Sequence, residues 1–171
     1  MASGTINKLI AVVKDSKGFQ HANYFTYTCP AKNLRDDTNE YTILSTSLPG
    51  RTLSTGEHSP GTVTKKFVYS FIDEDIQIVY RLTNDFSIYD KWQDWMAQVV
   101  QAEKYTVGYK DEYAADSFVS SLDKNMGVTK MFRLINSYPI IITPIELNND
   151  SENTIATFGV TLTFDRYETV G

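Results

Sequence analysis

The sequence predicts a β-rich α+β fold: an antiparallel β-sandwich or barrel of about seven strands with one amphipathic helix packed against it. Three observations support this class. Several short runs alternate apolar and polar residues, turn-forming residues separate these runs, and one segment has a helical period instead. Because strands and helices do not alternate along the chain, a doubly wound parallel sheet is not expected.

The first half of the chain holds four predicted strands. Residues 22–29 and 41–46 are rich in β-forming residues. Residues 62–72 and 76–82 alternate in hydropathy on either side of the acidic turn 73–75. Two alternating runs joined by three residues predict a β-hairpin.

The C-terminal part holds three more predicted strands. Residues 127–136 are one, and the alternation at 156–164 is the clearest pattern in the chain. The segment 138–147 between them is very apolar but carries Pro139 and Pro144. Because proline donates no hydrogen bond to a sheet, this segment is expected to be bent or to form an edge.

One amphipathic helix is predicted at about 87–103. Its apolar residues follow a spacing of three and four, which places them on one face: Ile88, Trp92, Trp95, Met96, Val99 and Val100. The tryptophan pair has two interpretations, a ligand-stacking platform or part of the core. The helical spacing favours the core, so we interpret Trp92, Trp95, Met96 and Val99 as the buried face of this helix.

Two further segments are predicted to contact other molecules, within what we expect to be a single domain spanning 1–171. Residues 1–20 form a short arm whose apolar residues Ile6, Leu9 and Ile10 need a surface to dock on. Residues 48–61 begin with Leu48-Pro49-Gly50 and contain three glycines and two prolines, which predicts a long loop. The sequence gives no clear element over 105–125.

Charge and cysteine content exclude several classes. The 171 residues include 16 basic and 21 acidic side chains, for a net charge of -5 and a pI near 5.0. Such a balance argues against electrostatic binding of nucleic acid. No apolar run is long enough for membrane insertion as a helix. The lone Cys29 excludes an intramolecular disulfide.

No catalytic, cofactor-binding or metal-binding constellation is predicted. Ser121 and Lys124 match S-x-x-K, but the companion motifs of that enzyme class are missing. The acidic turn 73–75 lacks the spacing of a calcium loop, and Cys29 is interpreted as a small buried hydrophobic residue. We therefore expect a protein that is not an enzyme and has no cofactor.

Four stretches, taken in order, resemble a known family. These are the strand around Asn23-Tyr24-Phe25, the break Leu48-Pro49-Gly50, the run from Ile76-Gln77-Ile78 through Asn84-Asp85 to Trp92-Gln93-Asp94-Trp95, and the C-terminal stretch 153–168. Their order and spacing are similar to the tail tube protein of contractile-tailed bacteriophages, the myophage inner tail tube family, which is related to secretion-system tube proteins.

The resemblance implies a structural virion protein whose hexameric rings stack into the inner tail tube. Its partners would be further copies of itself, the tail sheath protein, the baseplate, the tail terminator, the tape measure protein and genomic DNA passing through the lumen without sequence-specific binding. It would be made in the host cytoplasm and reside in the virion tail. On this interpretation the self-assembly contacts are Ile6, Leu9, Ile10, Leu48, Pro49, Gly50 and Arg51.

The resemblance also suggests how charge is used. Six copies at -5 carry a formal -30 per ring, which would repel DNA from the wall if that charge faced the lumen. Inward-facing Lys65 and Lys66 would contradict this arrangement.

Several alternatives remain open on sequence alone. Within the same class, the alternatives are a baseplate tube-initiator, a tail terminator and a secretion-system tube subunit. From another class, it is a monomeric β-sandwich that binds a glycan or peptide, with Tyr105, Tyr109 and Tyr113 at the site. An enzyme using Ser121 and Lys124 is the third alternative.

Overall fold

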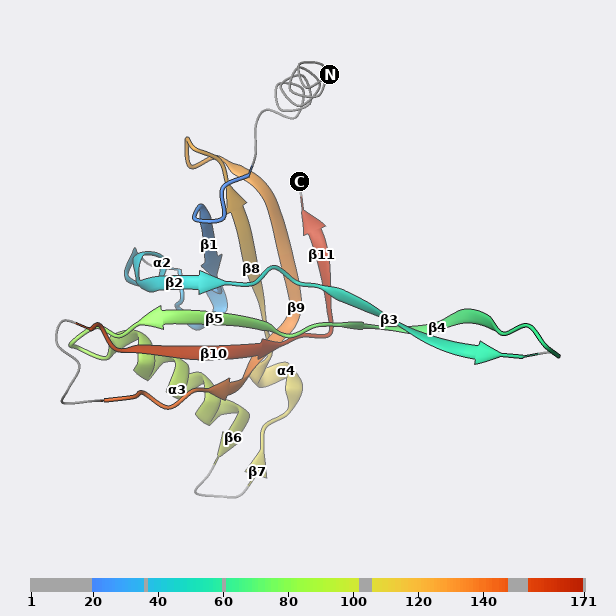
Figure 1. Cartoon of the computed structure of the whole chain (residues 1–171). Helices are drawn as coiled ribbons and strands as arrows, with labels where there is room; N and C mark the ends of the chain where they lie inside the picture. Colours follow the sequence, from blue (N-terminus) through green and yellow to red (C-terminus); the bar gives the residue numbers. More distant parts are fainter. Residues whose placement is uncertain (1–19, 36, 60, 102–105, 148–153, 171) are drawn as a thin grey trace, which may run out of the picture.

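The computed structural model describes residues 20–35, 37–59, 61–101, 106–147 and 154–170. A β-rich body carries one long two-stranded projection, and a single long helix packs against the body (Figure 1). This architecture confirms the predicted β-rich class with a flanking helix.

Seven strands form the main sheet, and all of their pairings are antiparallel. The strand order is β1 (Phe25–Thr28), β8 (Ala115–Leu122), β9 (Val128–Ile142), β10 (Thr157–Thr163), β5 (Ile76–Arg81) and β2 (Ile43–Thr46), while β11 (Arg166–Val170) also pairs with β9.

Strand β9 belongs to two differently directed halves of this sheet. Its first part pairs with β8 on one side and with β11 on the other, and its last part pairs with β10. Asn136, with a φ of 54°, lies between the two parts. We call β1, β8, β11 and the first part of β9 half A, and β2, β5, β10 and the last part of β9 half B. The two halves cross in direction (Figure 1).

The hydrophobic core lies between the two halves and helix α3 (Ser87–Val99). Half A contributes Tyr27, Val119 and Leu134, and the alternating residues of β5 and β10 contribute the facing layer. That layer comprises Ile76, Ile78, Tyr80, Phe158, Val160 and Leu162, all fully buried or nearly so. The alternation at 156–164 therefore predicted the buried face of β10 correctly.

Helix α3 begins where expected but ends earlier than the predicted residue 103. Val100 adopts extended backbone angles and pairs with Val107, so the chain leaves the helix through the short strands β6 (Val100–Gln101) and β7 (Thr106–Val107). Three shorter helices complete the helical content of the described residues: η1 (Pro30–Lys32), α2 (Asp37–Thr42) and α4 (Lys110–Tyr113).

The predictions of a loop at 48–61 and of a hairpin between 62–72 and 76–82 are wrong. Strand β3 (Arg51–His58) lies inside the predicted loop and pairs with β4 (Lys65–Asp73). Strand β5 instead pairs with β2 and β10. The acidic segment between β4 and β5 is thus a passage between two sheets and not a turn.

Candidate assembly surfaces

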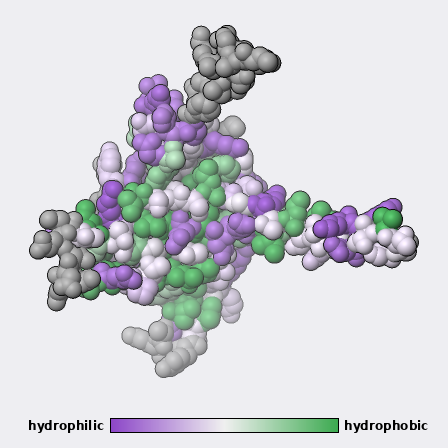
Figure 2. All heavy atoms as spheres, viewed as in Figure 1, coloured by the Kyte–Doolittle hydropathy of each residue, from purple (hydrophilic) through white to green (hydrophobic). Residues whose placement is uncertain are grey.

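The most prominent surface is a projecting hairpin, which we call the arm: β3, β4 and the turn between them. It extends away from the body with solvent on both faces (Figures 1 and 2). Its large apolar side chains are at least half exposed: Leu53, Val63, Phe67, Val68, Tyr69, Phe71 and Ile72. Isolated two-stranded hairpins are marginally stable in water. This arrangement therefore favours binding of another molecule that buries the exposed apolar side chains of the arm.

Arg51 fixes the arm to the body at its base. Its Nε donates to Asp73 Oδ1 at 2.6 Å and its Nη2 to Asp73 Oδ2 at 3.0 Å. The guanidinium also lies 4.4 Å from the ring centre of Phe71 and 4.9 Å from that of Tyr167 in β11. The hydrogen bond to Asp73 raises the pKa of Arg51 above its ordinary value. One side chain therefore joins both strands of the arm to half A.

The neighbouring residues reinforce this joint. Thr52 Oγ1 donates to Glu74 Oε1 at 2.5 Å, and the Glu74 N–H donates to the Gly50 carbonyl at 3.0 Å. A Cβ on Gly50 would lie 3.2 Å from Glu74 Oε2, so the bare backbone lets the Glu74 carboxylate approach closely. Leu48 is exposed and Pro49 is half-buried. The sequence-predicted residues Leu48, Pro49, Gly50 and Arg51 thus lead into the arm.

The second candidate surface is the face of half B that points away from the core. Ser45, Val79 and Gly159 occupy one row across the strands, and Gln77, Thr161 and Ile141 occupy another. Both rows are uncharged. Figure 2 shows hydrophilic and hydrophobic residues interspersed on this side of the body. This face is therefore polar but largely neutral.

The two edges of half B form the third candidate surface. Among the described strands, none pairs with the outer side of β2 or with the outer side of β9 at 138–142. Leu44 on the first edge and Ile140 and Ile141 on the second are exposed. Unpaired edges invite pairing with another strand. The bulge beside Pro139 and the open edge agree with the bent, edge-like segment predicted from the prolines.

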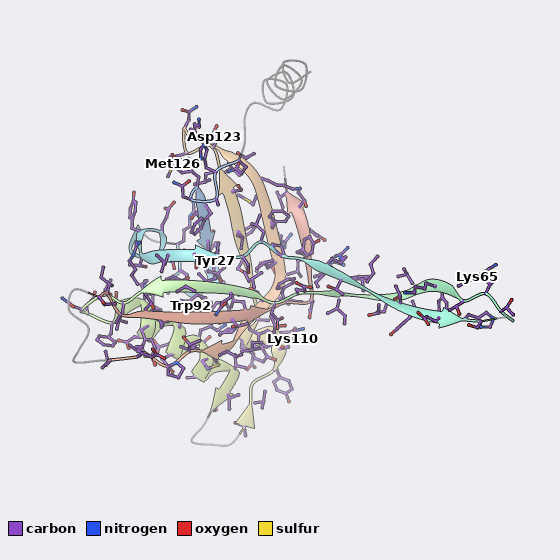
Figure 3. All side chains as sticks on the ribbon, in the orientation of Figure 1. Tyr27, Lys65, Trp92, Lys110, Asp123 and Met126 are labelled. Carbon is purple, nitrogen blue, oxygen red and sulfur yellow. The ribbon has the colours of Figure 1, made fainter. Side chains whose placement is uncertain are left out.

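The predicted core face of the helix is buried in the body. Trp92 and Trp95 stack with ring centres 5.3 Å apart, and Trp92 also stacks on Tyr27 at 6.1 Å (Figure 3 labels Trp92 and Tyr27). Trp95 Nε1 donates to the Tyr113 carbonyl at 2.8 Å. Val99 is buried and Met96 half-buried. Packing on all sides leaves these indole rings no free face for a ligand.

The N-terminal docking segment 1–20 predicted from the sequence lies outside the described residues, apart from Gln20. Ile6, Leu9 and Ile10 lie outside the described residues. The first described residue, Gln20, donates its side-chain amide to the Leu122 carbonyl at 2.7 Å. The chain therefore enters the described part of the fold at the end of β8.

The candidate catalytic motif is not assembled. Ser121 lies in β8, opposite Phe25 and Lys130, while Lys124 is exposed beyond the end of that strand. Residues three apart meet on a helix but not on a strand. Burial raises the pKa of the Cys29 thiol to about 11, so it is protonated at neutral pH. Among the described side chains, no group of three or more potential ligands could hold a metal ion.

The tyrosine site of the binding-module alternative is also not formed by the described residues. Tyr109 is exposed, whereas Tyr113 is buried and packs edge-on against Tyr138 at 5.1 Å. Tyr105 lies outside the described residues. The two described tyrosines point into different environments and do not share a face.

Comparison with protein families shows to which class of protein the chain belongs. The model of a family described as phage tail tube protein matches residues 13–170, which is nearly the whole chain. The chain belongs to this family. The comparison with curated proteins found no significant match.

Solved structures share the fold at low sequence identity. A chain of the anti-feeding prophage tube-terminating cap superposes with a TM-score of 0.67 at 17% identity, covering 89% of this chain and 91% of that chain. A chain of the PVC sheath–tube complex in the extended state gives 0.65 at 16%, with coverages of 89% and 91%. A chain of the anti-feeding prophage baseplate gives 0.64 at 10%, with coverages of 90% and 97%.

These findings define a structural tail tube protein, and neither the family nor these neighbours are enzymes. In the described residues, no helix is both long enough and apolar enough to span a membrane. The prediction of a structural virion component from four sequence stretches is therefore confirmed at the level of the family.

A polar network that no sequence pattern predicts lies where the two halves meet. Lys110 donates to Asp165, Asn136 Nδ2 donates to Asp165 Oδ2 at 2.8 Å, and the Asn136 N–H donates to Asp116 Oδ1 at 3.2 Å. These residues come from α4, β8, β9 and the β10–β11 corner. They are far apart in sequence, and only the left-handed preference of asparagine at 136 could have signalled the bend.

Proposed function

We propose that the chain is a tube subunit whose rings close by edge-to-edge pairing of half B, stack along the tube axis and surround a lumen through which the genome passes. The observation that carries this proposal is the pair of unpaired edges on opposite sides of the same four-stranded half. A β2 edge that meets the β9 edge of the next copy is a head-to-tail contact, and repeated rotation closes it into a ring.

The hydrogen-bonding pattern supports this pairing. The Ser47 N–H donates to Gln77 in β5 at 3.2 Å, so the N–H of Thr46 points away from β5. On the opposite edge the Thr143 N–H donates to Gly159 at 2.8 Å, so the neighbouring N–H of Ile142 points outward. Both edges therefore offer free donors to a neighbouring strand.

Closure would extend half B into a continuous barrel and place its outer face toward the lumen. Six subunits is the expected number, as in the related anti-feeding prophage baseplate, whose structure is six-fold symmetrised. The wall of the lumen would then be formed by the two rows that contain Thr161 and Gly159. The side chains of these rows carry hydroxyl, amide and aliphatic groups. DNA would meet a largely uncharged surface, with Arg81 at one end of β5.

The charge distribution differs from the strongly negative lumen considered from composition alone. The two central rows of the outer face hold no carboxylate. Lys65 and Lys66 lie at the far end of the arm and not on half B (Figure 3 labels Lys65). We infer that weak interaction with the wall, and not repulsion from it, permits passage.

The remaining partners follow from this placement. With half B inward, helix α3 lies on the outer side of the sheet, where a sheath protein would contact it. Baseplate and terminator proteins would meet the two ends of the tube, and a tape measure protein would fill the lumen before the genome does. A terminator or tube-initiator role predicts the same ring without continued stacking. A secretion-system tube subunit would use the same ring for another cargo.

Electron microscopy of concentrated, purified protein, with light scattering on the same sample, tests the proposal. Six-fold rings or hollow tubes are expected, and single rings that never stack would favour an initiator or terminator. A protein that stays monomeric alone and with a baseplate or preformed ring as a seed would overturn the proposal.

A further inference from the structure

Half A projects past the β2 edge of half B. Strand β9 begins in half A and crosses to the opposite edge of half B, where its last part, 138–142, pairs with β10. At about 3.3 Å per residue, the first part of β9, Val128–Ser137, is about 33 Å long, whereas half B is only about 14 Å wide between its outermost strands. The turn between β8 and β9 therefore extends beyond β2, as Figure 1 shows.

The projecting end of half A is a hydrogen-bonded turn that exposes apolar side chains. Asp123 Oδ1 accepts hydrogen bonds from the N–H groups of Asn125 at 2.7 Å and Gly127 at 2.9 Å. Met126 has a φ of 62° and is 61% exposed, and Val128 is 56% exposed. Figure 3 labels Asp123 and Met126 at this end. Methionine is uncommon in left-handed backbone, and strained backbone of this kind clusters at functional sites.

A second apolar surface lies beyond the opposite edge of half B. Val107 in β7 is 68% exposed, and Tyr109 just before α4 is 81% exposed. Helix α4 is fixed to the β9 edge, because Tyr113 packs edge-on against Tyr138 with ring centres 5.1 Å apart. Figure 1 shows β7 and α4 on this side of the body. The two exposed surfaces thus flank half B, one beyond each of its unpaired edges.

The two surfaces carry opposite charges. Residues 123–130 hold two lysines and one aspartate, a net charge of +1, and residues 107–113 hold one lysine and two acidic residues, a net charge of -1. The side chains that carry the excess charge on each surface are exposed. We call Lys124, Met126 and Val128 the turn surface, and Val107, Tyr109, Asp111 and Glu112 the α4 surface.

We propose that the turn surface of each copy packs on the α4 surface of the next copy in the same ring. This inference rests on the proposed function, because pairing of the β2 edge with the β9 edge of the next copy brings the two surfaces together. Both surfaces lie on the core side of half B, away from the lumen, so the ring gains a second contact outside the strand pairing. Methionine and tyrosine with oppositely charged neighbours are typical of a protein interface.

Cysteine cross-linking of the assembled chain tests the contact. The double variant Tyr109→Cys/Met126→Cys, treated with a short bismaleimide, is expected to give a ladder of covalent products up to the hexamer, because each copy links to the next. The chain's single natural cysteine, Cys29, is fully buried and does not compete. The control Met126→Cys/Leu147→Cys pairs the turn with an exposed residue outside both surfaces and should give no ladder.

Substitution of Met126 gives an independent readout. Asparagine adopts left-handed backbone more readily than methionine, so Met126→Asn should not lower the melting temperature of the subunit. Because it removes the apolar contact, the protein concentration at which rings form should rise about tenfold. Leu147→Asn removes an exposed apolar side chain outside both surfaces and should assemble like the parent chain.

The outcomes separate this contact from the ring itself. If Tyr109→Cys/Met126→Cys forms rings but no ladder, or if Met126→Asn assembles as well as the parent, the contact is wrong and the proposed function stands. If the parent chain forms no rings, the proposed function fails and this inference fails with it.

Discussion

The guanidinium of Arg51 lies 4.9 Å from the ring centre of Tyr167 while it forms a two-pronged ion pair with Asp73. Tyr167 belongs to β11 and Asp73 ends β4, so the contact joins the arm to the far strand of half A. The Asp73 side chain is only 4% exposed. A charged partner such as Arg51 is therefore needed to offset the cost of burying its carboxylate. The direction of the arm is thus set by a joint and not by the hairpin alone.

Replacement of Arg51 should loosen the arm. Arg51→Ala removes both the ion pair and the ring contacts, and Arg51→Lys keeps the charge but cannot reproduce the planar geometry. We expect faster amide hydrogen exchange in β3 and β4 in both variants, with less effect in α3. The control Arg166→Ala breaks an exposed pair with Glu168 and should leave exchange in the arm unchanged. Equal exchange in all variants would contradict the role of the joint.

Core truncation should destabilise the whole fold. Trp92 is fully buried against Trp95, Tyr27 and Tyr80. Trp92→Ala is expected to reduce the free energy of unfolding by about 3–5 kcal/mol. Asp94→Ala on the exposed side of α3 should change it by about 0.5 kcal/mol or less. Urea denaturation followed by circular dichroism measures both, and similar losses for the two variants would argue against this core.

A proline at the β2 edge should block assembly without unfolding the subunit. Because the Thr46 N–H points away from β5, Thr46→Pro removes a donor only from the proposed contact between subunits. Light scattering should report monomers while the melting temperature stays close to that of the parent. The N–H of Thr169 points away from β9, because Val170 and Met131 form a hydrogen-bonded pair, so Thr169→Pro places the same change on the edge strand of half A and should still assemble. Rings of Thr46→Pro protein would exclude this edge from the interface.

Acid should weaken the corner between the two halves. The hydrogen bond from Lys110 is the main cause that lowers the pKa of Asp165 below its ordinary value of 3.8, with Asn136 adding to the effect. A lowered folded-state pKa means that the contribution to stability is complete above about pH 4. It is lost as the pH falls through the folded-state value.

Thermal unfolding across pH 2–7 tests the corner. Asp165→Asn should melt below the parent at neutral pH, and the two curves should converge in acid. Asp111→Asn removes an exposed carboxylate for which the described residues provide no ion pair, so it should track the parent throughout. A constant difference between Asp165→Asn and the parent at every pH would refute the assignment.

Local patterns predicted the elements whose neighbours along the chain decide their conformation. Helix α3 and strand β10 follow from the periodicity of residues such as Trp92 and Val160, because each buries one face against a single core. The prolines at 139 and 144 indicated the bend and edge of β9 for the same reason. The family followed from the order of these elements.

Strand pairing could not be predicted in the same way. The segment 51–58 contains a glycine, two threonines and a serine, and it becomes β3 only because β4 pairs with it. A Cβ on Gly56 would lie 2.8 Å from the Phe67 ring, so this glycine is required by the partner strand and does not mark a loop. Similarly, the joint around Arg51 and Tyr167 brings together residues more than a hundred positions apart.

The most direct measurement is a cryo-electron microscopy reconstruction of the assembled chain at a resolution that separates strands. We expect closed rings in which β2 of one copy pairs with residues 138–142 of the next and the outer face of half B lines the lumen. Rings closed through other elements, or with α3 facing the lumen, would contradict it.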